Sequence, residues 1–340
     1  MKYGMKDIAK RANVSLTTVS LVLNNKESRI STQKKQEIKQ IAKEMNYQPN
    51  SAAVLLSKQI SYNIGLIVPD ITNPFFTELT QFINRKLREN GYFTLFVDSG
   101  NSYLGEKQAI QNMISRGVDG ILLVPSSEFF SADQDEVEQL FKSAGKPIIL
   151  LNASTDMDIS YVNFNNVEGA VMATQELVDH GHRKIAFIKG KDHLVNAHER
   201  YQGYQDGLRK NHIPFEQNLV FEGDYSSESG YHLAPQILKH PEITAILSSN
   251  DLMLFGLIKW SKEQGVDIFN HFSMVGFDNT PYTEIIEVPL TTIDQDADKM
   301  SADAIKMLLR KIKGKRDVTR QIVIKPKLIR RKSVKFIKWC

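Results

Sequence analysis

The stretch MKDIAKRANVSLTTVSLVLNNKESRIS, residues 5–31, decides how this chain begins to fold. Its first apolar residues recur at the i, i+3, i+4, i+7 spacing of one helix face: Met5, Ile8, Ala9 and Ala12. A tight turn follows, and Ser15 is a candidate N-cap for a second helix over about residues 16–24, with Val19 and Leu23 facing inward. Two short helices joined by a tight turn are typical of a helix-turn-helix, whose second helix lies in the DNA major groove.

The sequence after this stretch predicts a third helix and then a short connecting segment. Ser31 is placed to cap the third helix, in which Ile38, Ile41 and Met45 form the apolar stripe. A break is expected at Tyr47-Gln48-Pro49, because a proline disfavours helix in the residue before it. Residues 1–60 carry a net charge of +7, whereas the whole chain carries only +4. A basic head on an acidic body favours a polyanionic partner at the head.

From residue 64 onward the pattern changes to short apolar runs that alternate with amphipathic helical stretches. The runs read as strands and lie at 64–68, 93–97, 120–124, 147–151, 184–188, 244–247 and 273–277. The helical stretches between them include 76–90, 105–116, 167–180 and 196–211. This alternation predicts parallel sheets covered by helices, and the number of strands favours two α/β lobes over one.

Composition excludes several classes of protein. The single cysteine, Cys340, leaves no disulfide framework or cysteine-based metal site, which fits a reducing cytoplasm. The N-terminal residues lack the apolar run of a signal peptide, and no apolar run approaches the ~20 residues that a membrane helix needs. Four histidines invite a metal interpretation, but their spacing matches no zinc pattern: His180, His182, His193 and His198. We therefore expect a cytoplasmic protein without metal or cofactor.

The chain resembles the LacI/GalR family of bacterial repressors over essentially its whole length. The head matches that family's pattern through DIAKRANVSLTTVSLVLN and YQPNSAAVLLS. Further matches follow in the family's order: IGLIVPDITNPFF, DHGHRKIAFI, AILSSNDLMLFG, VGFDN and PLTTIDQ. The resemblance implies a small all-α helix-turn-helix head and a periplasmic-binding-protein-like body of two doubly wound parallel-sheet lobes, joined by three crossing segments. It also implies a homodimeric DNA-binding regulator, of repressor type, that binds operator DNA and a small effector.

The resemblance implies three regions in this chain. The helix-turn-helix domain takes residues 1–48, and a hinge helix with its linker takes 49–60. The effector-binding and dimerisation domain takes 61–340. Within it, the N-lobe is expected at about 61–160 plus 291–325, and the C-lobe at about 161–290 plus the C-terminal strand.

The resemblance also assigns the residues that contact DNA. In the head these are Ser15, Leu16, Thr17, Ser20, Leu21, Arg29 and Tyr47, and in the hinge Asn50, Ala53 and Leu56. Leu56 would wedge into the minor groove. Leu21 departs from the family, which usually has arginine there, and leucine offers only apolar contact, for instance with a thymine methyl. Val54 likewise stands where arginine is common, so we expect an unusual operator.

Polar and aromatic residues that follow the strands are the candidate effector ligands, because ligands of such sheets bind at the carboxyl ends of the strands. They are Asn73, Phe75, Phe76, Asn152, His198, Arg200, Tyr225, Asn250, Asp278 and Gln295. Amides and charged groups suit paired hydroxyls, and rings such as Tyr225 suit an apolar face, which favours a sugar, a sugar derivative or a nucleoside-like compound. At Asn152-Ala153 many sugar-binding relatives carry Asp-Arg, so recognition of ribose is not assumed.

Several alternatives remain open from sequence. A pure ligand carrier would not need the basic head, and an enzyme would need a nucleophile–base pair; the chain shows no G-x-S-x-G elbow, Walker motif or catalytic residues. The chain could also be a regulator that is co-repressed by a protein partner instead of a small molecule. The effector's identity, the operator sequence and the choice between induction and co-repression are left open.

Overall fold

The computed structural model describes residues 3–23, 28–47, 60–153, 155, 157–191, 194–314 and 320–337. The chain divides into two compact units, Met1–Ser61 and Tyr62–Cys340. The predicted hinge, with Asn50, Ala53 and Leu56, lies outside the described residues apart from Ile60. No helix within the described ranges combines the length and apolar character that a membrane crossing needs.

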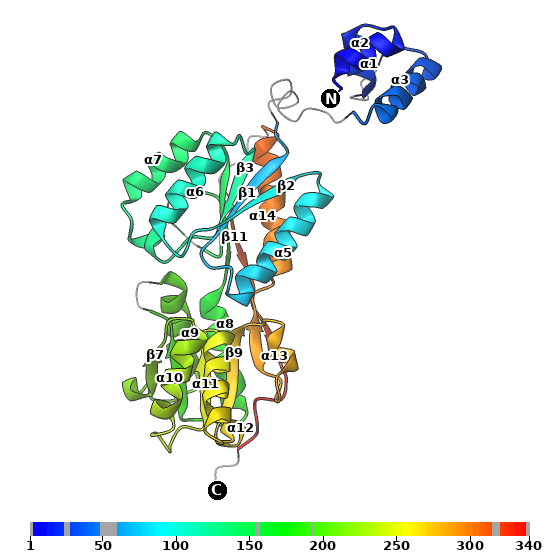
Figure 1. Ribbon diagram of the computed structural model, residues 1–340. Coiled ribbons are helices and arrows are strands. Elements are labelled where there is room, and N and C mark those ends of the chain that lie inside the picture. The colour runs from blue at the N-terminus through cyan, green and yellow to red at the C-terminus, as the bar shows by residue number, and fades with distance from the viewer. Residues whose placement is uncertain are drawn as a thin grey trace. The chain divides into compact units, whose positions relative to one another are not determined.

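Within its described residues, the N-terminal unit has three helices, labelled in Figure 1, and they enclose a small apolar core. They are α1 (Met5–Ala12), α2 (Leu16–Leu23) and α3 (Thr32–Glu44). The core is formed by Ile8, Ala9, Ala12, Val19, Val22, Ile38, Ile41 and Ala42. Val22 is buried and Leu23 is only half-buried, so the inward face of α2 is turned slightly from the one we expected. The Ser31 cap is confirmed, since its Oγ accepts a hydrogen bond from the Lys34 N–H at 3.3 Å.

The second unit contains two six-stranded sheets, one in each lobe. The N-lobe sheet has the order β11-β5-β4-β3-β1-β2, and every pairing in it is parallel. Its strands are β1 (Asn63–Val68), β2 (Phe93–Asp98), β3 (Gly120–Leu123), β4 (Ile148–Leu151), β5 (Tyr161–Phe164) and β11 (Gln321–Ile324). Its helices are α5 (Pro74–Glu89), α6 (Tyr103–Ser115), α7 (Gln134–Ala144) and α14 (Ala297–Ile312), with a short η1 (Glu128–Ser131).

The C-lobe sheet has the order β12-β10-β9-β8-β6-β7, in which only β12 runs antiparallel to its neighbour among the described pairs. Its strands are β6 (Ile185–Lys189), β7 (Val220–Glu222), β8 (Ala245–Ser248), β9 (Ser273–Asp278), β10 (Thr291–Asp294) and β12 (Lys327–Ile329). Its helices are α8 (Asn166–Asp179), α9 (Val195–Lys210), α10 (Ser227–Ile237), α11 (Asp251–Glu263), α12 (Ile268–His271) and α13 (Tyr282–Ile285), with η2 (Gln217–Leu219).

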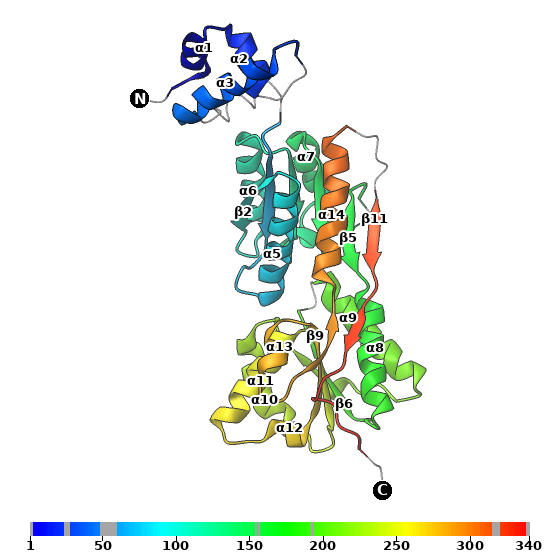
Figure 2. The ribbon, with the colours of Figure 1, turned by 90° about the vertical axis from the view of Figure 1, so that its right-hand side faces the viewer.

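The chain crosses between the two sheets three times, as the resemblance implied. The crossings lie between β5 and α8, between β10 and α14, and between β11 and β12 (Figure 2). Phe164 on β5 and Phe277 on β9 come from different lobes, and their rings meet edge to face with centroids 5.7 Å apart. One apolar cluster therefore continues from the N-lobe into the C-lobe.

Two of the expected lobe boundaries were wrong. Residues 161–164, which we placed in the C-lobe, form β5 and pair with β4 in the N-lobe sheet. Residues 291–294, which we placed in the N-lobe, form β10 and pair with β9 in the C-lobe sheet. The physical reason is that each strand pairs within the lobe that the chain is about to leave. The lobe boundary therefore falls after the strand, where the chain crosses. Sequence periodicity cannot locate it, because both strands are short and buried on both faces.

Candidate functional site

The N-terminal unit presents the first turn of α2 to solvent. Ser15 caps this helix, with its Oγ accepting a hydrogen bond from the Thr18 N–H at 3.1 Å. Leu16 is 43 % exposed although it is a large apolar side chain, and Thr17 is also exposed. Ser20 and Leu21, one turn later, are half-buried. The predicted base-reading residues therefore share one helix, with its exposed side chains at the N-terminal end.

The other predicted DNA contacts in this unit differ in how free they are. Arg29 is exposed, in the segment between α2 and α3. Tyr47 packs against the three-helix core, and this burial raises the pKa of its phenol. Tyr47 thus has a structural role in addition to any contact with DNA.

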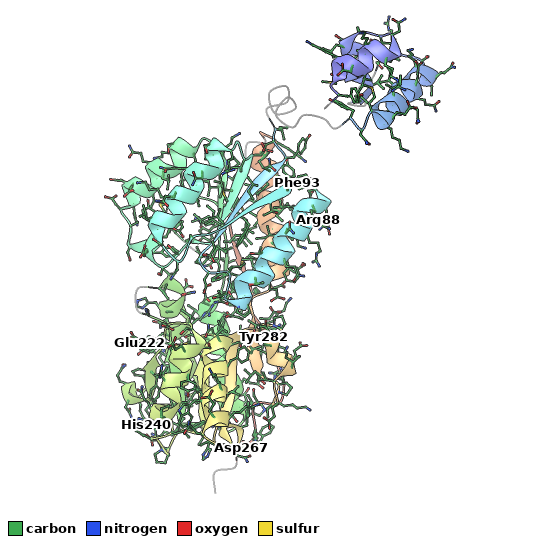
Figure 3. All side chains as sticks on the ribbon, in the orientation of Figure 1. Arg88, Phe93, Glu222, His240, Asp267 and Tyr282 are labelled. Carbon is green, nitrogen blue, oxygen red and sulfur yellow. The ribbon has the colours of Figure 1, made fainter. Side chains whose placement is uncertain are left out.

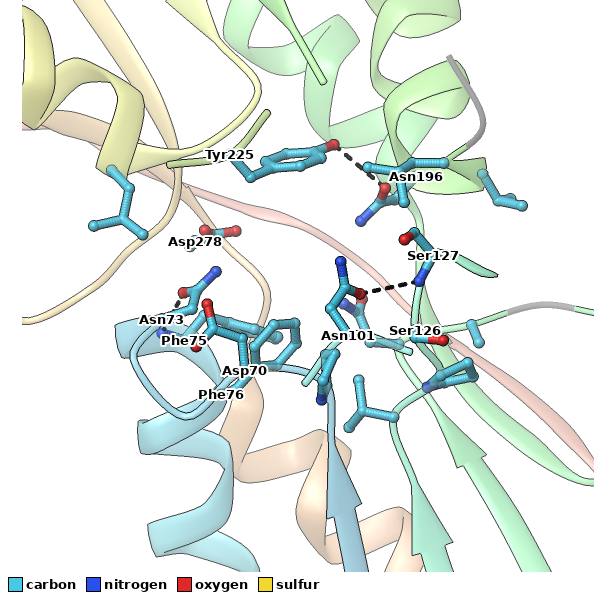
Figure 4. Close-up of a pocket in the computed structure, with 18 of the residues that line it drawn as sticks. Asp70, Asn73, Phe75, Phe76, Asn101, Ser126, Ser127, Asn196, Tyr225 and Asp278 are labelled. Carbon is cyan, nitrogen blue, oxygen red and sulfur yellow. Dashed lines mark hydrogen bonds between the residues drawn. The ribbon is translucent and has the colours of Figure 1, made fainter. Parts of the chain in front are cut away.

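The second unit contains a cavity of about 480 Å³ lined by both lobes (Figure 4). Eight of the ten predicted effector residues line it: Asn73, Phe75, Phe76, Asn152, Arg200, Tyr225, Asp278 and Gln295. They follow six different strands, and the cavity lies at the carboxyl ends of the strands in both sheets. This is the edge where ligands of parallel α/β sheets bind.

Hydrogen bonds between side chains and backbone fix the residues of the N-lobe that line the cavity. Asn73 caps α5, and its Oδ1 accepts from the Phe75 N–H at 3.0 Å. The rings of Phe75 and Phe76 meet edge to face with centroids 5.4 Å apart. Across the wall, the Oδ1 of Asn101 accepts from the Ser127 N–H at 3.1 Å. These bonds fix an aromatic pair and two amide side chains around one side of the cavity.

Beneath this wall lies a buried carboxyl that sequence analysis did not single out. Glu106 on α6 is fully buried, and one of its oxygens accepts from the Ser126 N–H on the cavity wall. Its other oxygen, Oε2, has no hydrogen-bond partner within the described part of the chain. Burial raises the pKa of this carboxyl to about 7, against the hydrogen bond from Ser126, which lowers it. Glu106 therefore supports the loop that carries Ser126 and Ser127.

The C-lobe wall is organised by Arg200, which is only 2 % exposed. Its Nε donates to Asn166 Oδ1 at 2.8 Å, and its Nη1 donates to the Ser249 carbonyl oxygen. The same Nη1 lies 3.6 Å from the Asp278 carboxylate. The guanidinium also stacks over the Phe277 ring at 3.9 Å from its centroid. A buried charge needs this many partners to offset its desolvation.

Asp278 lies at the end of β9 with its carboxyl buried between Arg200 and Gln295. Gln295 Nε2 donates to it at 2.6 Å. Burial raises the pKa of Asp278, and Arg200 opposes that shift. Asp251 lies behind it, where its carboxyl accepts from the Thr280 N–H at 2.9 Å and from Thr292 Oγ1 at 2.7 Å. Burial and the Asp278 charge raise the pKa of Asp251, so this residue has a structural role behind the cavity.

Tyr225 lines the cavity from the C-lobe, and its hydroxyl donates to Asn196 Oδ1 at 3.3 Å (Figure 4). The ring passes so close to Gly190 that a Cβ there would lie 2.3 Å from it, which only glycine allows. Tyr225 itself has φ 70°, and Asp278 has φ 110°. Residues other than glycine rarely adopt positive φ, and such strain clusters at functional sites.

Two predicted ligands do not line the cavity. His198 on α9 is exposed elsewhere. Asn250 is buried as the N-cap of α11: its Oδ1 accepts from the Met253 N–H at 3.0 Å, and its Nδ2 donates to the Tyr225 carbonyl at 2.8 Å. Asn250 thus uses its amide nitrogen to position Tyr225 and its amide oxygen to cap α11.

Comparison with known proteins places both units. Residues 4–50 match the model described as bacterial regulatory proteins, lacI family, and residues 61–338 match that of periplasmic binding proteins and the sugar-binding domain of the LacI family. The chain belongs to the LacI family. Like its family, it is a DNA-binding transcriptional regulator, with the helix-turn-helix in the N-terminal unit and the periplasmic-binding-protein-like body in the second.

Three LacI-family relatives illustrate the match. The chain is 31 % identical over 336 residues to the HTH-type transcriptional repressor PurR of Mannheimia succiniciproducens, covering 98 % of this chain and 99 % of that protein. The lac repressor dimer bound to operator and the anti-inducer ONPF superposes with a TM-score of 0.87 at 25 % identity, covering 98 % and 100 % of the two chains. The complex of the regulator CelR with cellobiose gives a TM-score of 0.71 at 25 % identity, with the same coverage.

Some cavity residues of this LacI-family protein were missed from sequence. They are Asp70, Asn101, Ser126, Ser127, Asn163, Asn166, Asn196 and Glu199. Most lie in the loops after β1, β2 and β3 or in the first turns of α8 and α9. Their position just after the carboxyl end of a strand could have identified them from the sequence.

Among the described histidines, His182 is buried, and burial lowers its pKa to about 4. It bonds to Thr244 Oγ1 and the Lys335 carbonyl, which gives it a structural role.

Proposed function

We propose that this protein binds operator DNA as a homodimer and that a small polar compound in the cavity of the second unit controls its DNA affinity. The observation that carries the proposal is the cavity itself: amide, hydroxyl and aromatic side chains from both lobes converge on one space, and one of them, Gln295, belongs to a crossing segment. A ligand that contacts both lobes alters the equilibrium between their relative orientations if it binds one orientation better.

The DNA interface is α2 of the N-terminal unit. Leu16 and Thr17 are exposed at its start, and Leu21 is half-buried one turn later. Thr17 offers a hydroxyl to base edges, whereas the two leucines offer only apolar contacts such as a thymine methyl. Arg29 supplies a phosphate contact, which positions the head without specifying sequence. Leu56 of the hinge is proposed as the wedge that enters the minor groove.

The effector is a sugar, a sugar derivative or a nucleoside-like compound. Tyr225 and Phe76 supply apolar faces, and Asn73, Asn152 and Gln295 supply amides, a combination suited to rings that carry several hydroxyls. The bound cellobiose of the CelR complex, in a structure of the same fold, supports this class.

The proposed homodimer is supported by exposed apolar side chains in both lobes. Phe93, on the edge strand β2, is 70 % exposed, and Tyr282, on α13, is 51 % exposed (Figure 3). Phe96 and Ile285 are exposed on the same two elements, at 40 % and 77 %. Large apolar side chains with this much exposure are candidates for burial against a partner. The matched lac repressor is itself a dimer, which favours a second copy of this chain as the partner.

A second candidate function is co-repression by a protein partner, and one surface feature favours it. A groove of about 390 Å³ lies between α5 and α14, with Ile305 and Leu309 beneath it. Lys306, Arg310 and Lys313 line it from α14 and the residue after it. A basic groove with an apolar floor suits an acidic protein segment. Loss of a protein's effect on DNA binding in Lys306→Glu/Arg310→Glu would support this candidate.

The experiment that tests the main proposal has two arms. Selection of DNA from a random pool by the full chain at ~0.15 M salt should yield a pseudo-palindrome, because a dimer reads two half-sites. A thermal-shift screen with sugars and nucleosides should then yield a compound that stabilises the second unit by mass action. Enrichment of no sequence, or stabilisation by no compound, would contradict the corresponding half of the proposal.

A further inference from the structure

The charges around the cavity are strongly unequal. Among the residues that the structure describes, four carboxylates line it: Asp70, Glu199, Asp224 and Asp278. The same described lining contains one cation, Arg200. A ligand that enters the cavity therefore meets a net negative surface, which disfavours anions more strongly as water is excluded.

Much of the hydrogen-bonding capacity of Arg200 is already used within the protein. Its Nε and Nη1 already donate to Asn166 Oδ1 and to the Ser249 carbonyl, and Asp278 lies 3.6 Å from Nη1. The face of the guanidinium lies over the Phe277 ring. An arginine that binds phosphate or carboxylate presents its N–H fork to the ligand, whereas Nε and Nη1 of Arg200 are directed at groups of the protein.

Helix N-termini are the other common anion sites, and those of α5 and α10 beside the cavity are occupied by the protein. In α5, Pro74 has no N–H, and Asn73 Oδ1 accepts the N–H of Phe75. In α10, Ser226 caps the helix, and the Asp224 carboxylate accepts the Ser226 N–H at 2.9 Å. In α9 no side chain caps the first turn, but the half-buried carboxylate of Glu199 lies one turn further along.

The cavity wall also has a surplus of hydrogen-bond acceptors. Three buried amide oxygens that line it have no partner within the described part of the chain: Asn152 Oδ1, Asn163 Oδ1 and Gln295 Oε1. A buried acceptor without a donor costs free energy, so a ligand that supplies donors gains affinity there. Hydroxyl groups supply such donors, whereas an ionised phosphate or carboxylate supplies acceptors alone.

We propose that the cavity selects a polyhydroxylated effector without phosphate or carboxylate groups, and that Glu199 and Asp224 are determinants of this selection. The inference rests on the proposed function, because it specifies the compound that the same cavity binds. It separates free sugars and nucleosides, which fit, from sugar phosphates and nucleotides, which do not.

The test is calorimetry and thermal shift of the full chain with matched pairs of compounds. Each pair is a neutral compound and its phosphate: ribose and ribose 5-phosphate, glucose and glucose 6-phosphate, adenosine and AMP, extended to every neutral hit of a wider screen. The expected result is that the neutral member binds at least about tenfold more tightly, since a phosphate would meet four carboxylates and one arginine among the described lining residues. Inorganic phosphate, compared with chloride at equal ionic strength, should not raise the midpoint of unfolding of the second unit.

The charge-removal variant Glu199→Gln/Asp224→Asn keeps the oxygens that accept from Asn166 and Ser226. It should reduce the preference for the neutral member by at least about fivefold. The matched control, Glu138→Gln/Asp206→Asn, removes two charges outside the cavity and should leave the preference unchanged.

The outcomes separate this inference from the proposed function. Tighter binding of any phosphorylated member than of its parent overturns the inference and leaves the proposed function standing. Stabilisation by inorganic phosphate that Asn196→Trp abolishes overturns it in the same way, because tryptophan would fill the cavity. A second unit that responds to none of these probes contradicts the proposed function, and the inference fails with it.

Discussion

The side-chain amide of Gln295 donates a 2.6 Å hydrogen bond to the carboxylate of Asp278. Asp278 ends β9 in the C-lobe, and Gln295 begins the crossing from β10 to α14, which packs in the N-lobe. Both side chains line the cavity. A compound bound there therefore contacts one of the three crossings directly, which gives the proposed coupling between ligand and lobe orientation a physical route.

Arg200→Met should destabilise the second unit by roughly 3–5 kcal/mol, because it leaves the buried Asp278 carboxylate without its cation. Adding Asp278→Asn should recover part of that loss, with a coupling free energy of about 1–3 kcal/mol. Urea unfolding of the four proteins in the double-mutant cycle at pH 7 measures it. Strictly additive effects would mean that the two side chains are not energetically coupled.

Glu106→Gln should change the pH dependence of stability. The pKa of Glu106 is about 7 in the folded protein, against an ordinary value of 4.5, so the folded state holds this proton more tightly than the unfolded state. The free energy of unfolding should therefore fall as the pH rises from about 4.5 to 7 and then level off. Glutamine cannot ionise, so the variant should be more stable than the parent at pH 8 by on the order of 3 kcal/mol and similar at pH 5.

Urea titrations between pH 5 and 8 check this difference, with the exposed substitution Glu138→Gln as the control. The carbonyl of glutamine still accepts from Ser126, so the loop of the cavity wall should be retained. A stability difference between Glu106→Gln and the parent that does not vary with pH would show that Glu106 keeps an ordinary pKa in the folded protein.

Leu21→Ala should alter which DNA sequence the protein prefers while leaving the salt dependence of binding unchanged. Leu21 carries no charge, so it contributes to base contact and releases no counterions. Arg29→Ala should weaken binding to all sequences about equally and lower the slope of log K against log salt by about one. Anisotropy titrations with the selected site and one-base variants, at several salt concentrations, distinguish the two. Equal slopes for both variants would remove Arg29 from the phosphate contacts.

Leu56→Ala should lower operator affinity without changing effector affinity, since the proposed wedge contacts DNA and not the cavity. Gel shift measures the first quantity and calorimetry with the stabilising compound measures the second. Unchanged operator binding by this variant would refute the proposed role of the hinge.

Much of the fold could be predicted because local patterns encode it. The apolar spacing of Ile8 and Ala12 and the caps at Ser15 and Ser31 define the head, and the seven apolar runs coincide with seven strands, all largely buried except the edge strand β2. The lobe boundaries could not be predicted, because Tyr161–Phe164 and Thr291–Asp294 are assigned by which strand pairs with them, a long-range property.

The residues of the site likewise divide into those that a local sequence pattern located and those that depend on long-range packing. Position after a strand located Asn73, Asn152 and Asp278 correctly at the cavity edge. The same rule could not tell that Asn250 points both polar atoms into the protein, because that depends on where the Tyr225 backbone passes. The burial of Glu106 beneath Ser126 depends on packing between α6 and the loop after β3, which no local pattern encodes.

The most direct test of the account is the operator affinity of the full chain, measured by fluorescence anisotropy with and without a saturating amount of the compound that stabilises the second unit. The account predicts that the compound changes the operator Kd at least about tenfold, in one direction or the other. It also predicts that Asn196→Trp, with its cavity filled, keeps its operator affinity and loses the response. An operator Kd that is the same with and without the bound compound would contradict the central claim.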